Sequence, residues 1–188
     1  DAGGGGDYTS FTQAEADVEN IGTSADLVAN DEAIVFEAVA GTYGAGLVTS
    51  SSLITDATRT VTYRAAAGSE HGGVAGAGVV IDTGAGGIAL QLGDDFTVVD
   101  GFNIATTTTN CAWIESAGNV VRNCIAAATN RGFLIYGGSV TAPNVFENCV
   151  GSGGASHAFF ALGGGPQSAD THTKIVNCTG SSTGNDAF

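Results

Sequence analysis

The sequence predicts an all-β fold, a right-handed parallel β-helix (a solenoid) with a short N-terminal capping α-helix. Three observations predict it. A short apolar segment that ends in Gly or Asn recurs four times, a pair of one small and one large apolar residue recurs between those segments, and the chain contains 30 glycines but only 2 prolines. Repeats of this length, with glycine turns and no helical periodicity between them, are typical of stacked β-strand coils.

The first repeat places Gly101, Asn123, Asn148 and Asn177 in one column, at spacings of 22, 25 and 29 residues. Gly and Asn both tolerate left-handed backbone angles, so each is expected at a sharp bend between two short strands. Stacked coils lie about 4.8 Å apart, a distance at which Asn side chains can hydrogen-bond to one another in a ladder. We therefore expect this column to be structural rather than ligand-binding.

The residues on the two sides of this bend are expected to face opposite ways. Those after it, expected to point into the core, are Phe102, Cys124, Cys149 and Cys178. Those before it, expected to form a surface ladder of alternating charge, are Asp100, Arg122, Glu147 and Val176. Parallel stacked cysteines are poorly oriented for disulfides, so we expect these thiols and Cys111 to be free.

The second repeat predicts a second strand column, so that each coil is expected to contribute two strand columns, with the large residue of each pair in the core. Its members are Ala89-Leu90, Ala112-Trp113, Gly132-Phe133, Ala158-Phe159 and Ala187-Phe188. Side chains that stack directly above their equivalents need such a regular alternation of size. We therefore expect Leu90, Trp113, Phe133, Phe159 and Phe188 to be core residues rather than parts of a cofactor site.

The chain divides into three segments. Residues 1–9 are expected to be a mobile Gly-rich entry, and residues 10–22 a capping helix with apolar Phe11, Ala14, Val18 and Ile21 at helical spacing. Residues 23–188 are expected to form the β-helix, which we expect to continue beyond residue 188. The first half is expected to contain strands at 34–39, 60–65, 79–82 and 88–92, and loops at 44–52, 68–78, 137–141 and 163–173 are expected to form the rim of any binding site.

Composition limits the possible partners. The net charge is −14, with 19 acidic and 5 basic residues. Nucleic acid is therefore not expected as a partner, because phosphate binding needs clustered Lys and Arg. No apolar run is long enough to span a membrane.

The candidate catalytic residues form only sparse groups. A polysaccharide lyase would need carboxylates that hold Ca²⁺ and a nearby base, and the best set is Asp94, Asp95, Asp100 and Arg122. A glycoside hydrolase could use Asp100 and Glu147, which equally fit a charge ladder. The histidines His71, His157 and His172 are isolated, apart from a weak pairing of His172 with Asp170. We therefore assign no catalytic, cofactor-binding or metal residue, and expect no cofactor, with Ca²⁺ left open.

The chain resembles the pectin-lyase-like right-handed β-helix proteins of bacteriophage virions and bacterial surfaces. The stretches that carry the resemblance are Gly6-Asp7-Tyr8-Thr9-Ser10, Thr55-Asp56-Ala57-Thr58-Arg59, Ser69-Glu70-His71, Val99-Asp100-Gly101-Phe102 and the repeated Asn-Cys pairs. The resemblance implies a virion or extracellular structural module that contacts copies of itself, other subunits or a host surface. The alternative it leaves open is a polysaccharide lyase, a glycoside hydrolase or a glycan-binding adhesin.

Overall fold

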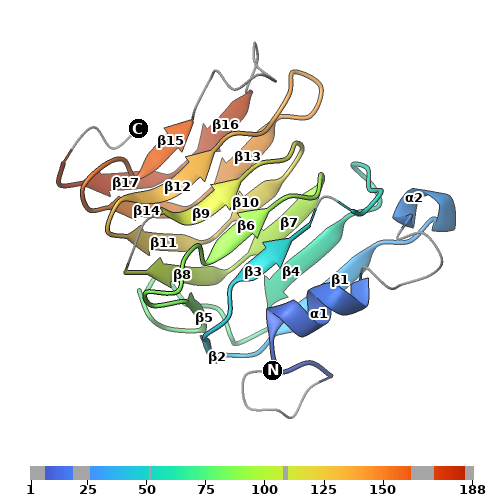
Figure 1. Cartoon of the computed structure of the whole chain (residues 1–188), viewed down its shortest axis with the longest axis horizontal. Helices are drawn as coiled ribbons and strands as arrows, with labels where there is room; N and C mark the ends of the chain where they lie inside the picture. Colours follow the sequence, from blue (N-terminus) through green and yellow to red (C-terminus); the bar gives the residue numbers. More distant parts are fainter. Residues whose placement is uncertain (1–6, 19–25, 51, 108–109, 162–171, 185–188) are drawn as a thin grey trace.

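A computed structural model shows a parallel β-helix of three sheets, with two short helices near its N-terminal end among the described residues (Figure 1). The structure describes residues 7–18, 26–50, 52–107, 110–161 and 172–184. The stack follows the sequence from β1 (Ile34–Ala38) at one end to β17 (Thr179–Ser182) at the other. The predicted fold class is confirmed. No helix in these residues is both long and apolar enough to cross a membrane.

Three strands make up a full coil, one from each sheet. Sheet I contains β1, β4 (Val61–Ala65), β7 (Thr97–Asp100), β10 (Val120–Arg122), β13 (Asn144–Glu147) and β16 (Thr173–Val176). Sheet II contains β2 (Gly41–Tyr43), β5 (Val79–Asp82), β8 (Phe102–Thr106), β11 (Ile125–Ala128), β14 (Val150–Gly153) and β17. Sheet III contains β3 (Leu47–Thr49), β6 (Leu90–Leu92), β9 (Asn110–Ile114), β12 (Arg131–Ile135) and β15 (Phe159–Ala161).

Every strand pair is parallel and in register, so equivalent side chains stack along the axis of the solenoid. In sheet I, the inward column runs through Tyr63, Val99, Val121 and Phe146, each with no exposed surface. In sheet III, the inward column runs through Leu90, Ala112, Phe133 and Phe159. Parallel strands buried in this way are expected to be almost continuously apolar on the core side.

Small residues in one sheet make room for large residues in another. Gly151 of sheet II faces the ring of Phe159, and a Cβ at Gly151 would lie 2.8 Å from that ring. The Phe159 ring stacks on Phe133 with centroids 4.8 Å apart, and Phe146 meets both rings edge-on. The ring of Phe159 therefore leaves no space for a side chain at position 151.

The helix α1 (Phe11–Val18) covers the N-terminal end of the core (Figure 1). Phe11 packs against Tyr43 and Phe102, with centroids 4.8 and 5.4 Å away, and Val18 is fully buried. The buried carboxylate of Glu15 accepts a hydrogen bond from the Tyr63 hydroxyl. The described part of the predicted helix is therefore a cap, while residues 1–6 and 19–22 of the first two predicted segments lie outside the described residues.

Three details differ from the sequence predictions. Each coil has three strands rather than two, because the Asn bend separates strands of two different sheets. Leu47–Thr49 is strand β3, although residues 44–52 were expected to form a loop. The segment Leu27–Asn30 is a short helix, α2, within the region expected to be all β; its N-cap is Asp26, whose carboxylate accepts a hydrogen bond from the backbone of Ala29.

Candidate functional site

The Asn column forms a continuous hydrogen-bonded ladder at the corner between sheets I and II. Asn177 Nδ2 donates to Asn148 Oδ1 at 2.8 Å, Asn148 Nδ2 to Asn123 Oδ1 at 3.3 Å, and Asn123 Nδ2 to Asp100 Oδ1 at 2.8 Å. The three Asn residues have φ between 51° and 55°, and Gly101 has φ of 82°. The corner is therefore the left-handed bend that the sequence predicted, and its side chains bind one another.

The outward charges of sheet I alternate in sign from strand to strand, and four of them form two ion pairs. Glu37, Arg64, Asp100, Arg122 and Glu147 are register partners in that order. Arg64 binds Glu37 through two nitrogens, at 3.0 and 2.5 Å, and Arg122 Nε binds Asp100 Oδ2 at 2.8 Å. This confirms the predicted ladder and extends it to two residues that the sequence analysis had not included.

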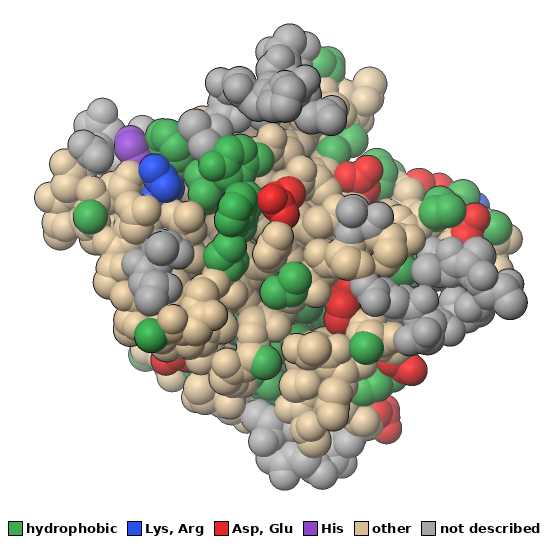
Figure 2. Space-filling view, in the orientation of Figure 1, with side chains coloured by type: hydrophobic (Ala, Val, Ile, Leu, Met, Phe, Trp, Pro, Cys, Tyr) green, Lys and Arg blue, Asp and Glu red, His purple; other side chains and the backbone are tan. Residues whose placement is uncertain are grey.

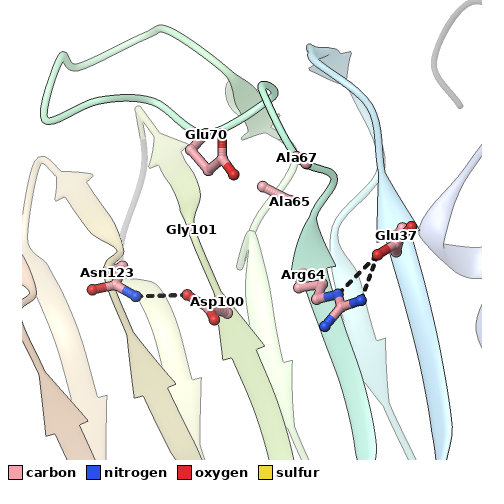
Figure 3. Close-up of a pocket in the computed structure, with 8 residues that line it drawn as sticks. All are labelled: Glu37, Arg64, Ala65, Ala67, Glu70, Asp100, Gly101 and Asn123. Atoms are coloured by element: carbon pink, nitrogen blue, oxygen red, sulfur yellow. Dashed lines mark hydrogen bonds and ion pairs between the residues drawn. The ribbon is translucent and has the colours of Figure 1, made fainter.

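A polar pocket of about 350 Å³ lies at this corner (Figure 3). Its lining comprises Glu37, Arg64, Ala65, Ala67, Glu70, Asp100, Gly101 and Asn123. Each charged group already has a protein partner: Glu70 accepts from the backbone of Gly68, Arg64 binds Glu37, and Asp100 binds Arg122 and Asn123. Within the described residues, no group of three or more His, Cys, Asp or Glu side chains is arranged to hold a metal ion.

The four residues predicted as a possible lyase site do not come together. Asp94 and Asp95 precede β7, whereas Asp100 ends it, so the length of this strand separates them. Asp94 is only 2% exposed and accepts a hydrogen bond from the backbone of Leu53, while Asp95 accepts one from the backbone of Ala117. These two carboxylates hold neighbouring turns together, and Arg122 lies beside Asp100 alone.

The histidines also lie apart. His71 Nε2 contacts the backbone oxygen of Asn123 at 2.6 Å, and its Nδ1 accepts from the backbone of Gly73 at 2.8 Å. This pair of contacts requires the proton on Nε2 and ties the 68–78 loop to the Asn corner. His157 stacks on Phe160 with centroids 4.5 Å apart, and His172 is exposed before β16. Asp170, its predicted partner, lies outside the described residues.

The outer face of sheet III carries an aromatic surface, and one of its residues, Trp113, was predicted to lie in the core. Trp113 pairs in register with Gln91 on one side and Leu134 on the other, and Leu134 pairs with Phe160. Its indole is therefore on the outside, 5.6 Å from the ring of Tyr136. The prediction that Trp113 lies in the core was wrong. The core residue of this strand is its smaller neighbour, Ala112.

We call this surface, made of Trp113, Tyr136 and Phe160, the sheet III platform; Leu134 pairs with both Trp113 and Phe160 and is only 2% exposed. Figure 2 shows hydrophobic side chains gathered over β9, β12 and β15 beside a basic side chain and a histidine. The Arg131 guanidinium lies over the Phe160 ring, 4.7 Å from its centroid. Of the chain's four arginines it alone has no carboxylate within ion-pair distance among the described residues.

The cysteines are free, as predicted, and those of the Asn-Cys column stack along the core. Burial raises the pKa of Cys111 from 9.0 to about 12. A hydrogen bond with Cys124, together with burial, raises the pKa of Cys149 far above its usual range. Thiols with raised pKa values are poor nucleophiles, so this column acts as packing. Leu90, Phe133 and Phe159 are core residues as expected, and Phe188 lies outside the described residues.

No family model, curated protein or solved structure matches this chain. The assignment of the fold as a parallel β-helix therefore depends on the strand register and the stacked core alone. The resemblance to pectin-lyase-like proteins and the phage context stay predictions from the sequence.

Proposed function

We propose that this chain is a structural β-helix module of a phage virion or a similar extracellular assembly, and that it contacts a surface glycan through the sheet III platform. The resemblance of its sequence motifs supports the virion or extracellular context. The single observation that supports the glycan contact is the platform itself: Trp113 and Tyr136 on the outer face of a rigid sheet, flanked by hydrogen-bonding side chains.

The chemistry of the platform suits a sugar better than a purely apolar partner. Sugar rings have apolar C–H faces and polar hydroxyl edges; Trp113 and Tyr136 offer large apolar rings, and Tyr136 also offers a hydroxyl, whereas Trp113 Nε1 is buried. Beside the rings, Gln91 Nε2 donates to Glu115 Oε2 at 2.6 Å, and Arg131 Nη1 lies 3.4 Å from Asn110 Oδ1. Arg131 supplies a cation not already neutralised by a carboxylate, so a carboxylated sugar is the class of ligand we expect.

Binding is favoured over catalysis because the candidate carboxylates are occupied. Asp94 and Asp95 accept backbone hydrogen bonds at turns, and Asp100 is held by Arg122 and Asn123. A general acid or base must reach the substrate proton directly or through one water molecule. These groups instead stabilise the solenoid at the two ends of β7.

The test is binding of the full chain to a panel of acidic and neutral bacterial polysaccharides, with and without Ca²⁺. We expect binding to at least one acidic glycan, without new reducing ends or unsaturated products. Tyr136→Ala, at a site 40% exposed, is expected to weaken binding about tenfold or more, and Arg131→Gln to weaken binding of acidic glycans selectively. Val35→Ala, at an exposed site on sheet I, is the matched control and should bind as the unmodified chain does.

Two results would refute the proposal. Binding that is unchanged in the Tyr136 and Arg131 variants would move the site elsewhere on the molecule. Release of shortened glycan products would make the chain an enzyme.

A further inference from the structure

We infer that the outer face of sheet I is an interface at which a second copy of this chain docks face to face about a two-fold axis. The inference rests on the proposed structural role and names the partner. It uses a different face from the sheet III platform, so the two proposals can fail separately.

The outer face of sheet I combines an apolar column with the charge ladder. Val98, Val120 and Val145 are register partners, and each precedes a fully buried residue of the inward column. Successive side chains of a strand point to opposite faces, so these three half-buried valines face outward. In the ladder beside them, the side chains of Arg64 and Arg122 are 48% and 44% exposed. The face therefore offers apolar contact area next to accessible charges of both signs.

Phe96 extends the apolar column in an unusual backbone conformation. Its φ is 52°, and it is the one described residue other than Asn, Asp and Gly with a left-handed φ. Bulky side chains are disfavoured there, and strain of this kind clusters at binding surfaces and other functional sites. The conformation brings the half-buried ring to Gly118, where a Cβ would lie 2.6 Å from it. Gly118 stands two residues before the outward Val120, so the ring lies over the outer face of the sheet.

The charges of this face complement themselves, which is why the partner is a second copy. From β4 to β13 the ladder reads Arg64, Asp100, Arg122 and Glu147. A two-fold axis along the strand direction, between β7 and β10, reverses this order in the second copy. Asp100 then faces Arg122 of the second copy, and Arg64 faces its Glu147. These four side chains carry no net charge, whereas the whole chain has a net charge of −14, so the face brings together less like charge than the average surface would.

The apolar column selects the same axis. With the axis between β7 and β10, Val98 faces Val120 of the second copy, and Phe96 faces its Gly118, where the absent side chain leaves room for a ring. An axis between β4 and β7 would also pair opposite charges, but it would place Val98 against Thr62. Sheets that pack face to face with their strands aligned are a common arrangement, and a two-fold contact of this kind closes as a dimer.

The size of the face predicts a weak dimer. Strands lie about 4.8 Å apart and rise about 3.3 Å per residue, so the six described strands, over the five positions from Phe96 to Asp100, make a face of roughly 500 Å². Two such faces bury about 1,000 Å² in total, the lower limit for a specific interface. We therefore expect reversible association with a micromolar or weaker dissociation constant.

The experiment is sedimentation equilibrium of the full 188-residue chain from micromolar to millimolar concentration, in reducing buffer so that the thiols cannot cross-link copies. We expect the mass to rise from 18.5 kDa to about twice that value and no further. Arg64→Glu and Glu147→Arg each place like charges opposite one another across the axis, so each should weaken self-association at least tenfold. Asp82→Arg makes the same change of charge at the exposed end of β5 in sheet II, and it should leave the dimer intact.

Mixing the two variants gives the second readout. One copy then carries only carboxylates at positions 64 and 147, and the other only guanidinium groups, so every pair across the axis again joins opposite charges. We expect a heterodimer at least as tight as the unmodified dimer, whereas mixing would not repair a variant that had failed to fold.

A monomer at all concentrations, a polymer larger than a dimer, variants that associate as the unmodified chain does, or no association on mixing would each overturn the inference. Glycan binding by a monomeric chain would leave the platform proposal standing.

Discussion

Asn148 occupies the middle of the Asn ladder, and its replacement tests the ladder most sharply. Its side chain donates to Asn123 at 3.3 Å and accepts from Asn177 at 2.8 Å, while its backbone has φ of 52°. Alanine removes both hydrogen bonds and also strains the bend, because its Cβ is disfavoured in the left-handed region. Glycine removes the same hydrogen bonds without that steric strain, so the two variants separate the contributions.

The magnitudes follow from this geometry. The two amide hydrogen bonds are solvent-exposed, so each is expected to contribute about 0.5 kcal/mol, the lower end of the usual range. The left-handed backbone adds about 1 to 2 kcal/mol for alanine. Glycine instead loses stability through the greater freedom of its unfolded chain, by about 0.5 to 1 kcal/mol. We therefore expect Asn148→Ala to cost about 2 to 3 kcal/mol and Asn148→Gly about 1.5 to 2 kcal/mol.

The assay is urea unfolding followed by circular dichroism, with the midpoint shift converted to free energy at a common slope. Asn148→Asp keeps a side-chain acceptor and tolerates the bend, but it loses the donor to Asn123. Its free energy of unfolding should therefore lie between those of the unmodified chain and the alanine variant. An alanine variant as stable as the glycine variant would refute the claim that this residue sits in a strained left-handed bend. An effect below about 0.5 kcal/mol in all three would refute the ladder.

Two further predictions concern the core. Because the folded-state pKa of Cys111 is raised from 9.0 to about 12, its thiol contributes stability that is complete below pH 9 and is lost as the pH rises toward 12. In reducing buffer, the free energy of unfolding should therefore fall by up to about 1.4 kcal/mol per pH unit above pH 9 from this thiol. Cys111→Ala should make that decline shallower, and an identical decline in the variant would contradict the assignment. Phe133→Ala should cost about 3 to 5 kcal/mol by urea unfolding, since its fully buried ring packs on two others. Trp113→Ala should cost less than half as much, and the reverse order would restore Trp113 to the core.

The sequence was most informative where backbone geometry restricts residue type. Gly and Asn are favoured at the corner, so Gly101, Asn123, Asn148 and Asn177 could be aligned from their spacing alone. This alignment correctly predicted the inward cysteines and the outward charges, because both are placed relative to the bend. The buried face of α1 was equally recoverable, since Phe11, Ala14 and Val18 follow helical spacing.

The sequence was less informative where both faces of a strand are apolar. In β9, Ala112 and Trp113 are adjacent, and a size pattern alone cannot tell which of them points inward. The larger residue was assigned to the core, although Ala112 faces the core and Trp113 faces outward. The same ambiguity concealed the sheet III platform.

Sites are hard to predict from this sequence because proximity in sequence differs from proximity in a solenoid. Asp94, Asp95 and Asp100 are close in sequence, but β7 places them at opposite ends of a strand. Conversely, Glu37 and Arg64 are separated by 27 residues and form an ion pair across adjacent coils. A signal for the second pair existed, because both residues lie three positions after the apolar first residue of a strand.

The most direct test of the stacked architecture is nuclear Overhauser contacts among the Asn side chains in solution. The account predicts contacts from the Asn148 side-chain amide to both Asn123 and Asn177, none between Asn123 and Asn177, and the pattern of parallel strands between β10, β13 and β16. Side-chain amides without mutual contacts, or close Hα–Hα contacts typical of antiparallel pairing between these strands, would contradict it.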